Sequence, residues 1–306
     1  MLWAFSLRFF QNTREYIKAS MNIPIYISMQ TLRRLKQIQE LLEQLDPQAP
    51  PQALVAPGSP LPRGEIIVFP GSFNPPTTAH LALLKQARHF AQLETARGRG
   101  SMQLYAALSK HIVDKETVER PLLLDRILLL DNLLRRRFPH AGILLFNRGL
   151  YVEQAEAVHT SFPQVRRLLF LMGFDKIVQI LDPHYYEDRD AALHELFALA
   201  ELLVAPRGDE GEQSLDELLQ RPENQPFARY IHTLPFDPAY REISSTQIRQ
   251  HASMHQHEIP REVRRFMRET RAYAPPLPLP DGTEIDFYAE RVKLLESLLR
   301  SVSSEK

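Results

Sequence analysis

Short apolar runs alternate with amphipathic helical patterns over most of this sequence. The runs are four or five residues long, as buried strands are, and the helical patterns repeat apolar residues every three or four positions. The runs are Ile66–Phe69, Leu104–Leu108, Ile143–Phe146, Leu168–Met172, Leu202–Ala205 and Tyr230–Leu234, and the helical patterns are Leu81–Thr95, Pro121–Phe138, Val152–Ser161, Ala191–Ala200 and Arg261–Thr270. This alternation predicts an α/β fold, a Rossmann-like, doubly wound and mostly parallel sheet with right-handed crossovers. A ligand is expected at the carboxyl ends of the strands.

Two proline-rich breaks divide the chain. Residues 47–63 hold six prolines and residues 274–282 hold four, a density that excludes a helix and favours an extended linker. We therefore predict a main domain over residues 64–273, an N-terminal helical extension over residues 1–46, and a linker with a C-terminal helix over residues 274–306.

Both extensions contain an amphipathic helical pattern, at Thr31–Leu45 and near Phe287–Val302. The first helix either docks on the domain's own surface or binds a partner, and a homo-oligomer is one such arrangement. The sequence does not decide the oligomeric state.

Composition excludes several classes of protein. The 37 Lys and Arg residues balance 37 Asp and Glu residues, which argues against a general binder of nucleic acid or membrane surfaces. Without cysteine there are no disulfides, thiol nucleophiles or cysteine zinc sites. Arg8 interrupts the apolar N-terminus, and no uncharged apolar stretch approaches the ~18 residues of a membrane span. We expect a soluble protein, compatible with a cytoplasmic location, and no resident metal site.

The most informative segment is IIVFPGSFNPPTTAHLALL at residues 66–84, a buried strand running into a turn and then a helix. Gly71 lets a phosphate approach the backbone, and the free N–H groups of the helix start carry partial positive charge. Thr77 and His80 are three residues apart and share a face of the first helical turn. The segment therefore predicts an anion site, although most strand–turn–helix connections only join elements.

A second segment, EISSTQIR at residues 242–249, follows the last strand candidate and opens another helix. Ser244, Ser245 or Thr246 can cap that helix, and Arg249 can reach the same anion with its guanidinium fork. Alone, this pattern is ordinary helix capping. Together, the two segments predict a triphosphate held between two helix N-termini at the switch point of the sheet.

GSFNPPTTAH and ISSTQIR resemble the paired signatures of the nucleotidyltransferase α/β superfamily, and more closely those of nicotinamide/nicotinate mononucleotide adenylyltransferases. FLMGFDKI at residues 170–177 resembles that family's strand-end Gly-x-Asp. The resemblance covers residues 64–273, which would be the nucleotidyltransferase domain. It implies an adenylyltransferase that joins the AMP part of ATP to nicotinamide or nicotinate mononucleotide and releases pyrophosphate, in NAD synthesis, with Mg²⁺ entering with ATP.

The resemblance also implies roles for single residues. His80 would stabilise charge on the α-phosphate with help from Thr77, and Arg249 would hold the β- and γ-phosphates. The ATP-binding residues would further include Gly71, Ser72, Phe73, Gly173, Asp175, Ser245 and Thr246. Tyr186 takes the place of the family's stacking Trp. Thr at 77 and Ala at 79 depart from the bacterial pattern and resemble the eukaryotic-type loop.

Basic residues near strand ends are candidates for the phosphate of the acceptor. Lys110 and Lys115 follow the second strand candidate, Arg207 follows the fifth, and Arg126 lies inside a strongly apolar helix. Each has an alternative role as a solvated or structural side chain. The same motifs could serve another phosphorylated acceptor, hydrolyse a nucleotide, or belong to a non-catalytic nucleotide-binding scaffold. The amide and acid forms of the mononucleotide are not distinguished by the sequence.

Overall fold

The structure is a computed structural model, and it describes residues 28–110, 120–206, 211–250 and 254–303. It divides into two compact units. One comprises residues 34–264 and holds the sheet, and the other comprises the described parts of residues 1–33 and 265–306.

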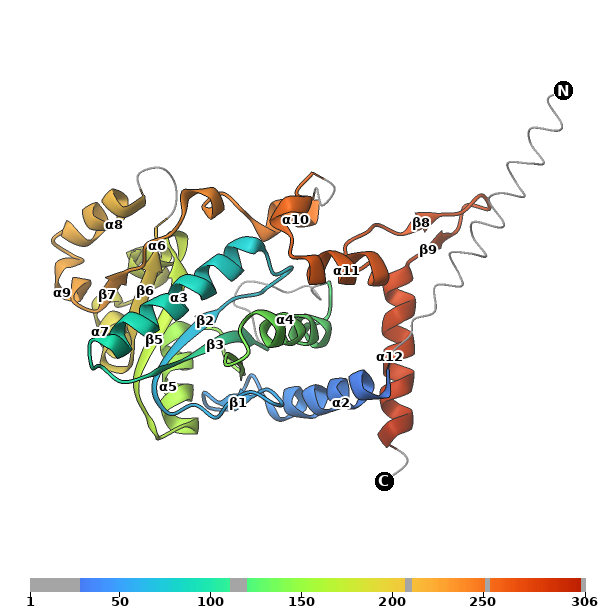
Figure 1. Cartoon of the computed structure of the whole chain (residues 1–306), viewed down its shortest axis with the longest axis horizontal. Coiled ribbons are helices and arrows are strands. Elements are labelled where there is room, and N and C mark those ends of the chain that lie inside the picture. The colour runs from blue at the N-terminus through green and yellow to red at the C-terminus, as the bar shows by residue number, and fades with distance from the viewer. Residues whose placement is uncertain (1–27, 111–119, 207–210, 251–253, 304–306) are drawn as a thin grey trace. The chain divides into compact units, whose positions relative to one another are not determined.

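The first unit is built on a seven-stranded sheet in the order β1-β4-β3-β2-β5-β6-β7 (Figure 1). Six strands are parallel and β1 pairs antiparallel with β4. The strands are β1 (Ala53–Val55), β2 (Gly64–Pro70), β3 (Met102–Ser109), β4 (Gly142–Phe146), β5 (Val165–Gly173), β6 (Glu201–Ala205) and β7 (Ile231–Thr233). From β2 the chain adds β3 and β4 on one side and then β5, β6 and β7 on the other, so the strand order reverses between β2 and β5. This order confirms the predicted doubly wound α/β fold.

Helices cover both faces of this sheet (Figure 1). The helices packed on one face are α2 (Met29–Gln44), α3 (Thr78–Ala96) and α4 (Leu123–Arg137), and those on the other are α5 (Tyr151–Ser161), α6 (Phe174–Leu181), α7 (Arg189–Leu199), α8 (Gly211–Gln220) and α9 (Gln225–Ala228). Beyond β7 come α10 (Ser245–Gln250), α11 (Arg261–Thr270), the hairpin of β8 (Leu277–Pro278) and β9 (Glu284–Ile285), and α12 (Phe287–Ser303). No helix among the described residues is both long and apolar enough to cross a membrane.

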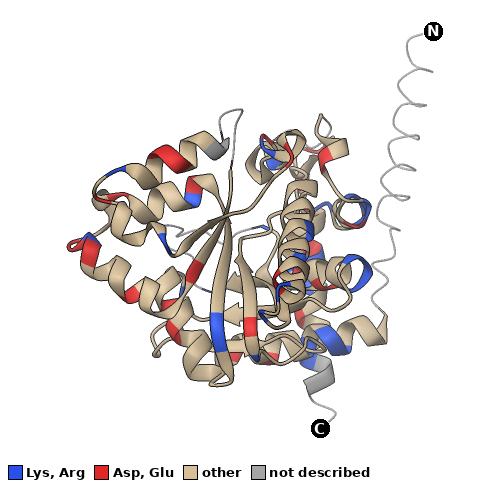
Figure 2. Cartoon of the chain, turned by 60° about the vertical axis from the view of Figure 1, so that its left-hand side comes forward, with Lys and Arg blue, Asp and Glu red and all other residues tan. Residues whose placement is uncertain are grey.

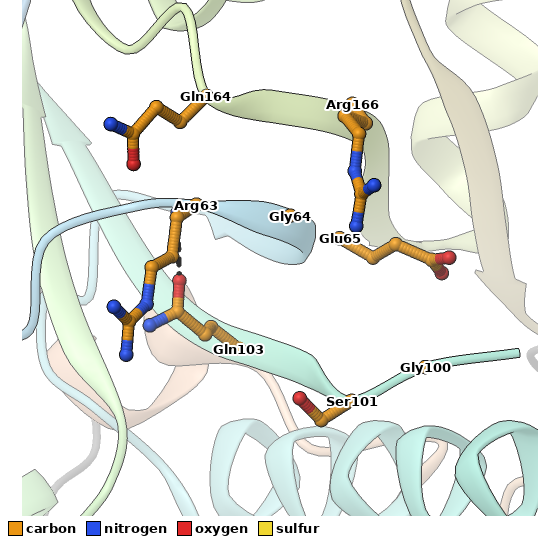
Figure 3. Close-up of a pocket in the computed structure, with 8 residues that line it drawn as sticks. All are labelled: Arg63, Gly64, Glu65, Gly100, Ser101, Gln103, Gln164 and Arg166. Carbon is orange, nitrogen blue, oxygen red and sulfur yellow. Dashed lines mark hydrogen bonds between the residues drawn. The ribbon is translucent and has the colours of Figure 1, made fainter.

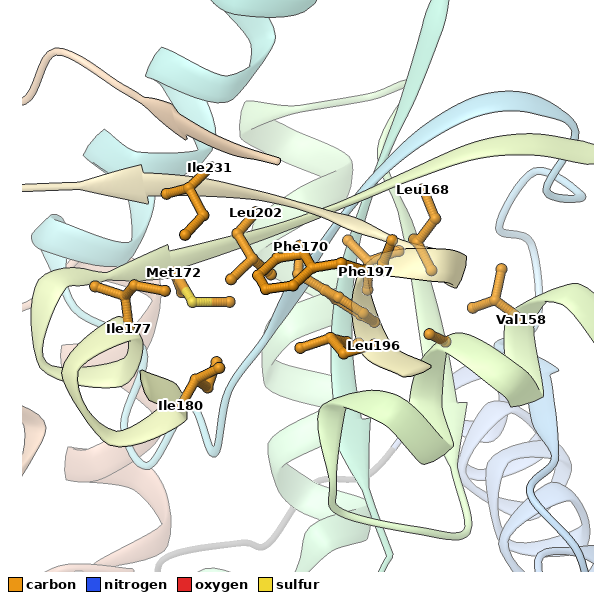
Figure 4. Close-up of a cluster of buried hydrophobic side chains, with 14 of the residues drawn as sticks. Val158, Leu168, Phe170, Met172, Ile177, Ile180, Leu196, Phe197, Leu202 and Ile231 are labelled. Carbon is orange, nitrogen blue, oxygen red and sulfur yellow. The ribbon is translucent and has the colours of Figure 1, made fainter. Parts of the chain in front are cut away.

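The strands are apolar on both faces because both faces are covered. Ile66 and Val68 of β2 belong to one buried cluster, and Ile67 and Phe69 belong to the other. This period of two places alternate side chains on opposite faces. Figure 4 shows the first cluster, in which Phe170 of β5 lies among aliphatic and aromatic side chains from the neighbouring strands and helices.

The strand β1 lies inside the segment that the sequence predicts as a proline-rich linker. Its prolines flank residues 53–55 and leave them free to pair with β4. The buried side chain of Asn147, just after β4, accepts from Gln52 N at 2.8 Å and donates to Asp46 O at 2.8 Å and Pro50 O at 2.9 Å. One asparagine thus fixes the part of the segment that enters the sheet.

Residues of both charge signs lie on neighbouring strands of the sheet (Figure 2), and their side chains form ion pairs. Arg167 of β5 donates to Glu201 of β6 through two nitrogens, each at 2.8 Å, and lies 3.4 Å from Glu65 of β2. His232 of β7 contacts Glu201 at 2.5 Å. Burial alone would raise the pKa of Glu201, but hydrogen bonds from Arg167 and His232 outweigh it and hold the pKa at about 2.

We expect Glu201→Gln to lower Tm by about 2–4 °C at pH 7, which corresponds to about 1 kcal/mol. Because the carboxyl pKa of Glu201 is depressed in the folded protein, its stabilisation is present above pH 4.5 and is lost as pH falls towards 2. The Tm gap between wild type and variant should therefore narrow as pH falls from 5 to 3. Thermal melts across that range test this, and a gap that is constant with pH would contradict it.

Candidate active site

The loop between β2 and α3 lies at the carboxyl edge of the sheet, beside the point where the strand order reverses. Phe73 is fully buried within it and has a positive φ of 44°, which few non-glycine residues adopt. A Cβ at Gly71 would lie 3.1 Å from the Phe73 ring. The buried Phe73 ring and Gly71 together hold the loop backbone in one conformation at the carboxyl edge of the sheet.

Thr77 and His80 cap the start of α3 reciprocally. Thr77 Oγ1 accepts from His80 N at 3.3 Å, while His80 Nδ1 lies 3.0 Å from Thr77 N and 2.7 Å from Thr77 Oγ1. This is a capping box with histidine in the position that Glu or Gln usually takes. Since a backbone N–H can only donate, Nδ1 must accept, and the proton of the neutral ring is on Nε2.

The His80 ring packs between two phenylalanines. Its centroid lies 5.1 Å from that of Phe73 and 5.8 Å from that of Phe69. Burial lowers the pKa of His80 to about 4. At neutral pH His80 is therefore uncharged and carries its proton on Nε2.

We expect the titration of His80 to be absent from the pH dependence of catalysis between pH 6 and 8. A group with a pKa of about 4 is already neutral in this range. The profiles of kcat/KM for ATP should thus have the same shape in wild type and in His80→Gln. A limb with a pKa between 6 and 8 that is present in wild type and lost in the variant would contradict the neutral donor.

The segment around α10 reaches this loop directly. Ser245 Oγ donates to Pro75 O at 2.9 Å, although the two residues are 170 positions apart in the chain. Arg249 donates to Asn74 O at 2.5 Å and to Thr246 Oγ1 at 3.1 Å. The start of α10 is held by Ser244, whose Oγ accepts from Thr246 N at 3.3 Å. The two sequence segments therefore form one site.

A cavity of about 190 Å³ lies beside the loop at the carboxyl ends of the strands. It is lined by Pro70, Gly71, Ser72, Leu108, Ser109, Arg126, Gly149, Tyr151, Gln154 and Lys176. Arg126 is only 4% exposed and donates to Ser72 O at 3.0 Å. Among these lining residues the charged side chains are two cations, Arg126 and Lys176, and none is a carboxylate. The cavity thus suits an anionic ligand.

A larger cavity, of about 390 Å³, lies at the opposite, amino edge of the sheet. Figure 3 shows Arg63 and Arg166 beside Gly64 and the Gln103 side chain hydrogen bonded to the backbone of Arg63. Gly100, in its wall, follows the C-terminal end of α3, where the helix dipole disfavours anions. Neither sequence segment reaches this cavity.

A family model described as cytidylyltransferase-like matches residues 68–251, more than half of the 306 residues. The chain belongs to the cytidylyltransferase-like family. The match contains both segments that build the site, and membership in this family confirms the predicted resemblance to nucleotidyltransferases.

Individual relatives are more distant from this cytidylyltransferase-like chain. It is 27% identical over 157 residues to a putative nicotinamide mononucleotide adenylyltransferase of Schizosaccharomyces pombe, and the match covers 50% of this chain and 57% of that protein. The chain thus spans little more than half the length of this curated relative.

Two solved structures are similar at lower identity. One is a Plasmodium falciparum nicotinic acid mononucleotide adenylyltransferase complexed with APC, with 13% identity, a TM-score of 0.48, and coverage of 69% of this chain and 98% of that one. The other is a putative nicotinate-nucleotide adenylyltransferase from Vibrio parahaemolyticus, with 12% identity, a TM-score of 0.30, and coverage of 67% and 99%.

The structure brings most of the predicted ATP-binding residues of this family member to the loop. Gly71, Ser72, Phe73, Thr77, His80, Ser245, Thr246 and Arg249 lie on the loop or on the two helices that start beside it. Gly173 ends β5 and is the N-cap residue of α6, and a Cβ there would meet open space. Asp175 is exposed in the first turn of α6.

The predicted acceptor residues are dispersed. Arg126 lines the cavity, but the Tyr186 hydroxyl donates to Ile180 O at 2.8 Å and the Lys110 amine donates to Leu42 O at 2.7 Å. Lys115 and Arg207 lie outside the described residues. The sequence missed Ser109, Gly149, Tyr151, Gln154 and Lys176 in the cavity wall. Only their positions in the chain could have pointed to them. Ser109 is the last residue of β3, the next three follow the end of β4, and Lys176 lies in the first turn of α6, just after β5.

Proposed function

We propose that this chain is an adenylyltransferase that transfers the AMP part of ATP to the phosphate of a pyridine mononucleotide. A phosphate oxygen of the mononucleotide forms a bond to the α-phosphorus of ATP, and the bond from that phosphorus to pyrophosphate breaks. The observation that carries this proposal is the joining of α10 to the β2–α3 loop by Ser245 and Arg249.

The chemistry needs positioning and charge stabilisation rather than a covalent intermediate. We assign the Nε2–H of His80 to the α-phosphate, where negative charge changes most as the bonds exchange. Arg249 and Thr246 would hold the β- and γ-phosphates, since the guanidinium is a fixed cation at the loop. Mg²⁺ would enter on the triphosphate as part of the substrate MgATP.

The acceptor would occupy the cavity beside the loop. Arg126 and Lys176 supply positive charge for its phosphate, and Tyr151 supplies an aromatic wall for its base. The name of the S. pombe relative supports a pyridine mononucleotide as this acceptor and a role in NAD synthesis. We further propose residues 64–273 as the catalytic domain, which contains the whole family match, and a cytoplasmic location.

The proposal is tested by incubating the full chain with MgATP and a panel of phosphorylated acceptors and identifying the products by mass. The panel should hold nicotinamide mononucleotide, nicotinate mononucleotide and phosphopantetheine. We expect a dinucleotide with either or both pyridine compounds and none with phosphopantetheine. Transfer to phosphopantetheine alone, or release of AMP without transfer, would contradict the proposal.

A further inference from the structure

The cavity beside the β2–α3 loop has a polar corner made by Ser109, Gly149 and Gln154. Gln154 is 3% exposed. Its Nε2 donates to Ser109 Oγ at 3.0 Å and to Gly149 O at 3.2 Å. Because a carbonyl oxygen only accepts, the contact with Gly149 fixes which end of the Gln154 amide is nitrogen.

This pairing leaves one donor and one acceptor of the corner unused within the described part of the chain. Ser109 Oγ accepts from Gln154, so its own proton is available, and the Ser109 side chain makes no second hydrogen bond there. Gln154 Oε1 is buried and has no hydrogen-bond partner among the described residues. A buried unpaired acceptor is costly unless a ligand or water satisfies it.

We infer that this corner recognises a primary carboxamide, so that the enzyme prefers the amide form of the mononucleotide to the acid form. The inference rests on the proposed function. A carboxamide can accept from the Ser109 hydroxyl through its oxygen and donate to Gln154 Oε1 through its nitrogen. A carboxylate offers acceptors only, so one of its oxygens would meet Gln154 Oε1 with no proton between them. Sites built around such hydrogen bonds reject the analogue that leaves them unpaired.

The neighbouring wall fits a flat ring that carries this group. Tyr151 lies three residues before Gln154 on α5, on the same helical face, and lines the same cavity. Its ring packs edge-on against Phe170 with 5.2 Å between centroids. Burial raises the pKa of the Tyr151 phenol, which therefore stays neutral and adds no charge that would favour an acid.

The test compares kcat/KM for nicotinamide mononucleotide and nicotinate mononucleotide at saturating MgATP, in the full chain. Wild type should prefer the amide at least tenfold. Gln154→Leu, which keeps a similar volume, should reduce this preference to about threefold or less by raising KM for the amide while KM for ATP stays unchanged. Ser109→Ala should reduce it in the same direction. Gln213→Leu, on an exposed glutamine of α8, should keep the full preference.

Each outcome decides the inference. Equal use of the two mononucleotides by wild type, or preference for the acid, overturns it while leaving adenylyl transfer intact. Full amide preference in Gln154→Leu and Ser109→Ala overturns the assignment to this corner. Use of neither mononucleotide overturns the proposed function and this inference with it. If Gln154→Leu does not melt cooperatively, Ser109→Ala carries the test, since it removes only a hydroxyl group.

Discussion

The His80→Ala variant is expected to lose about 10²–10³ in kcat with KM for ATP nearly unchanged. Removing one preorganised donor to charge that develops in the transition state typically costs about 2.7–4 kcal/mol. The contact strengthens only as the reaction proceeds, so ground-state binding of ATP should change little. Steady-state kinetics of dinucleotide formation measure both constants.

His80→Gln is the conservative control for His80→Ala. Glutamine is the usual partner in a capping box and can accept from Thr77 N as Nδ1 of His80 does. Its Tm should therefore stay near that of wild type, whereas His80→Ala leaves the Thr77 N–H without its acceptor and should melt lower. The amide nitrogen of the glutamine also keeps a neutral N–H donor, so His80→Gln should retain more turnover than His80→Ala. A folded His80→Ala variant with wild-type kcat would leave His80 as a capping residue only.

Arg249→Ala is expected to raise KM for ATP and to lower kcat, with a fall of about ten- to a hundredfold in kcat/KM. Hydrogen bonds to charged groups are worth about 1.5–3 kcal/mol, and this guanidinium would bind phosphates already in the ground state. The variant also loses the bonds to Asn74 O and Thr246 Oγ1 that link the loop to α10. The KM effect distinguishes Arg249 from His80.

Two further variants control for charge and for general disturbance. Arg249→Lys keeps the charge but lacks the planar fork, so it should recover only part of the loss. Arg229→Ala removes an exposed arginine that stacks on Tyr230 just before β7, and it should keep wild-type kinetics. An unchanged KM for ATP in Arg249→Ala would refute the phosphate role.

The fold follows closely from the spacing of apolar residues. Runs such as Leu168–Met172 are apolar at every position because helices cover both faces of the sheet, and the structure extends this run to Val165–Gly173. The helix α11 coincides with the predicted Arg261–Thr270. The helix α6 was missed because it is only eight residues long and begins directly after Gly173, the last residue of β5. The strand β1 was missed because its pairing depends on Asn147, almost a hundred residues away.

The sequence likewise predicts only part of the candidate site. The turn at Gly71 and the helix that follows it are local structures, so their sequence segment predicts them. The reciprocal cap of Thr77 and His80 was not predicted. Other side chains around the cavity, such as Ser109, Gln154 and Lys176, come from a strand end and from two separate helices and belong to no motif. For Lys110, the sequence predicts a position just after a strand end. It does not predict that the amine donates to Leu42 O, because that contact depends on how α2 packs.

We propose that the β2–α3 loop and α10 together form one triphosphate site for adenylyl transfer. Reaction of the full chain with ATP labelled at the α-phosphate and nicotinamide mononucleotide tests it most directly. We predict that the label moves into the dinucleotide while an equal amount of unlabelled pyrophosphate is released. Label recovered in AMP or ADP, or left in ATP, would contradict adenylyl transfer at this site.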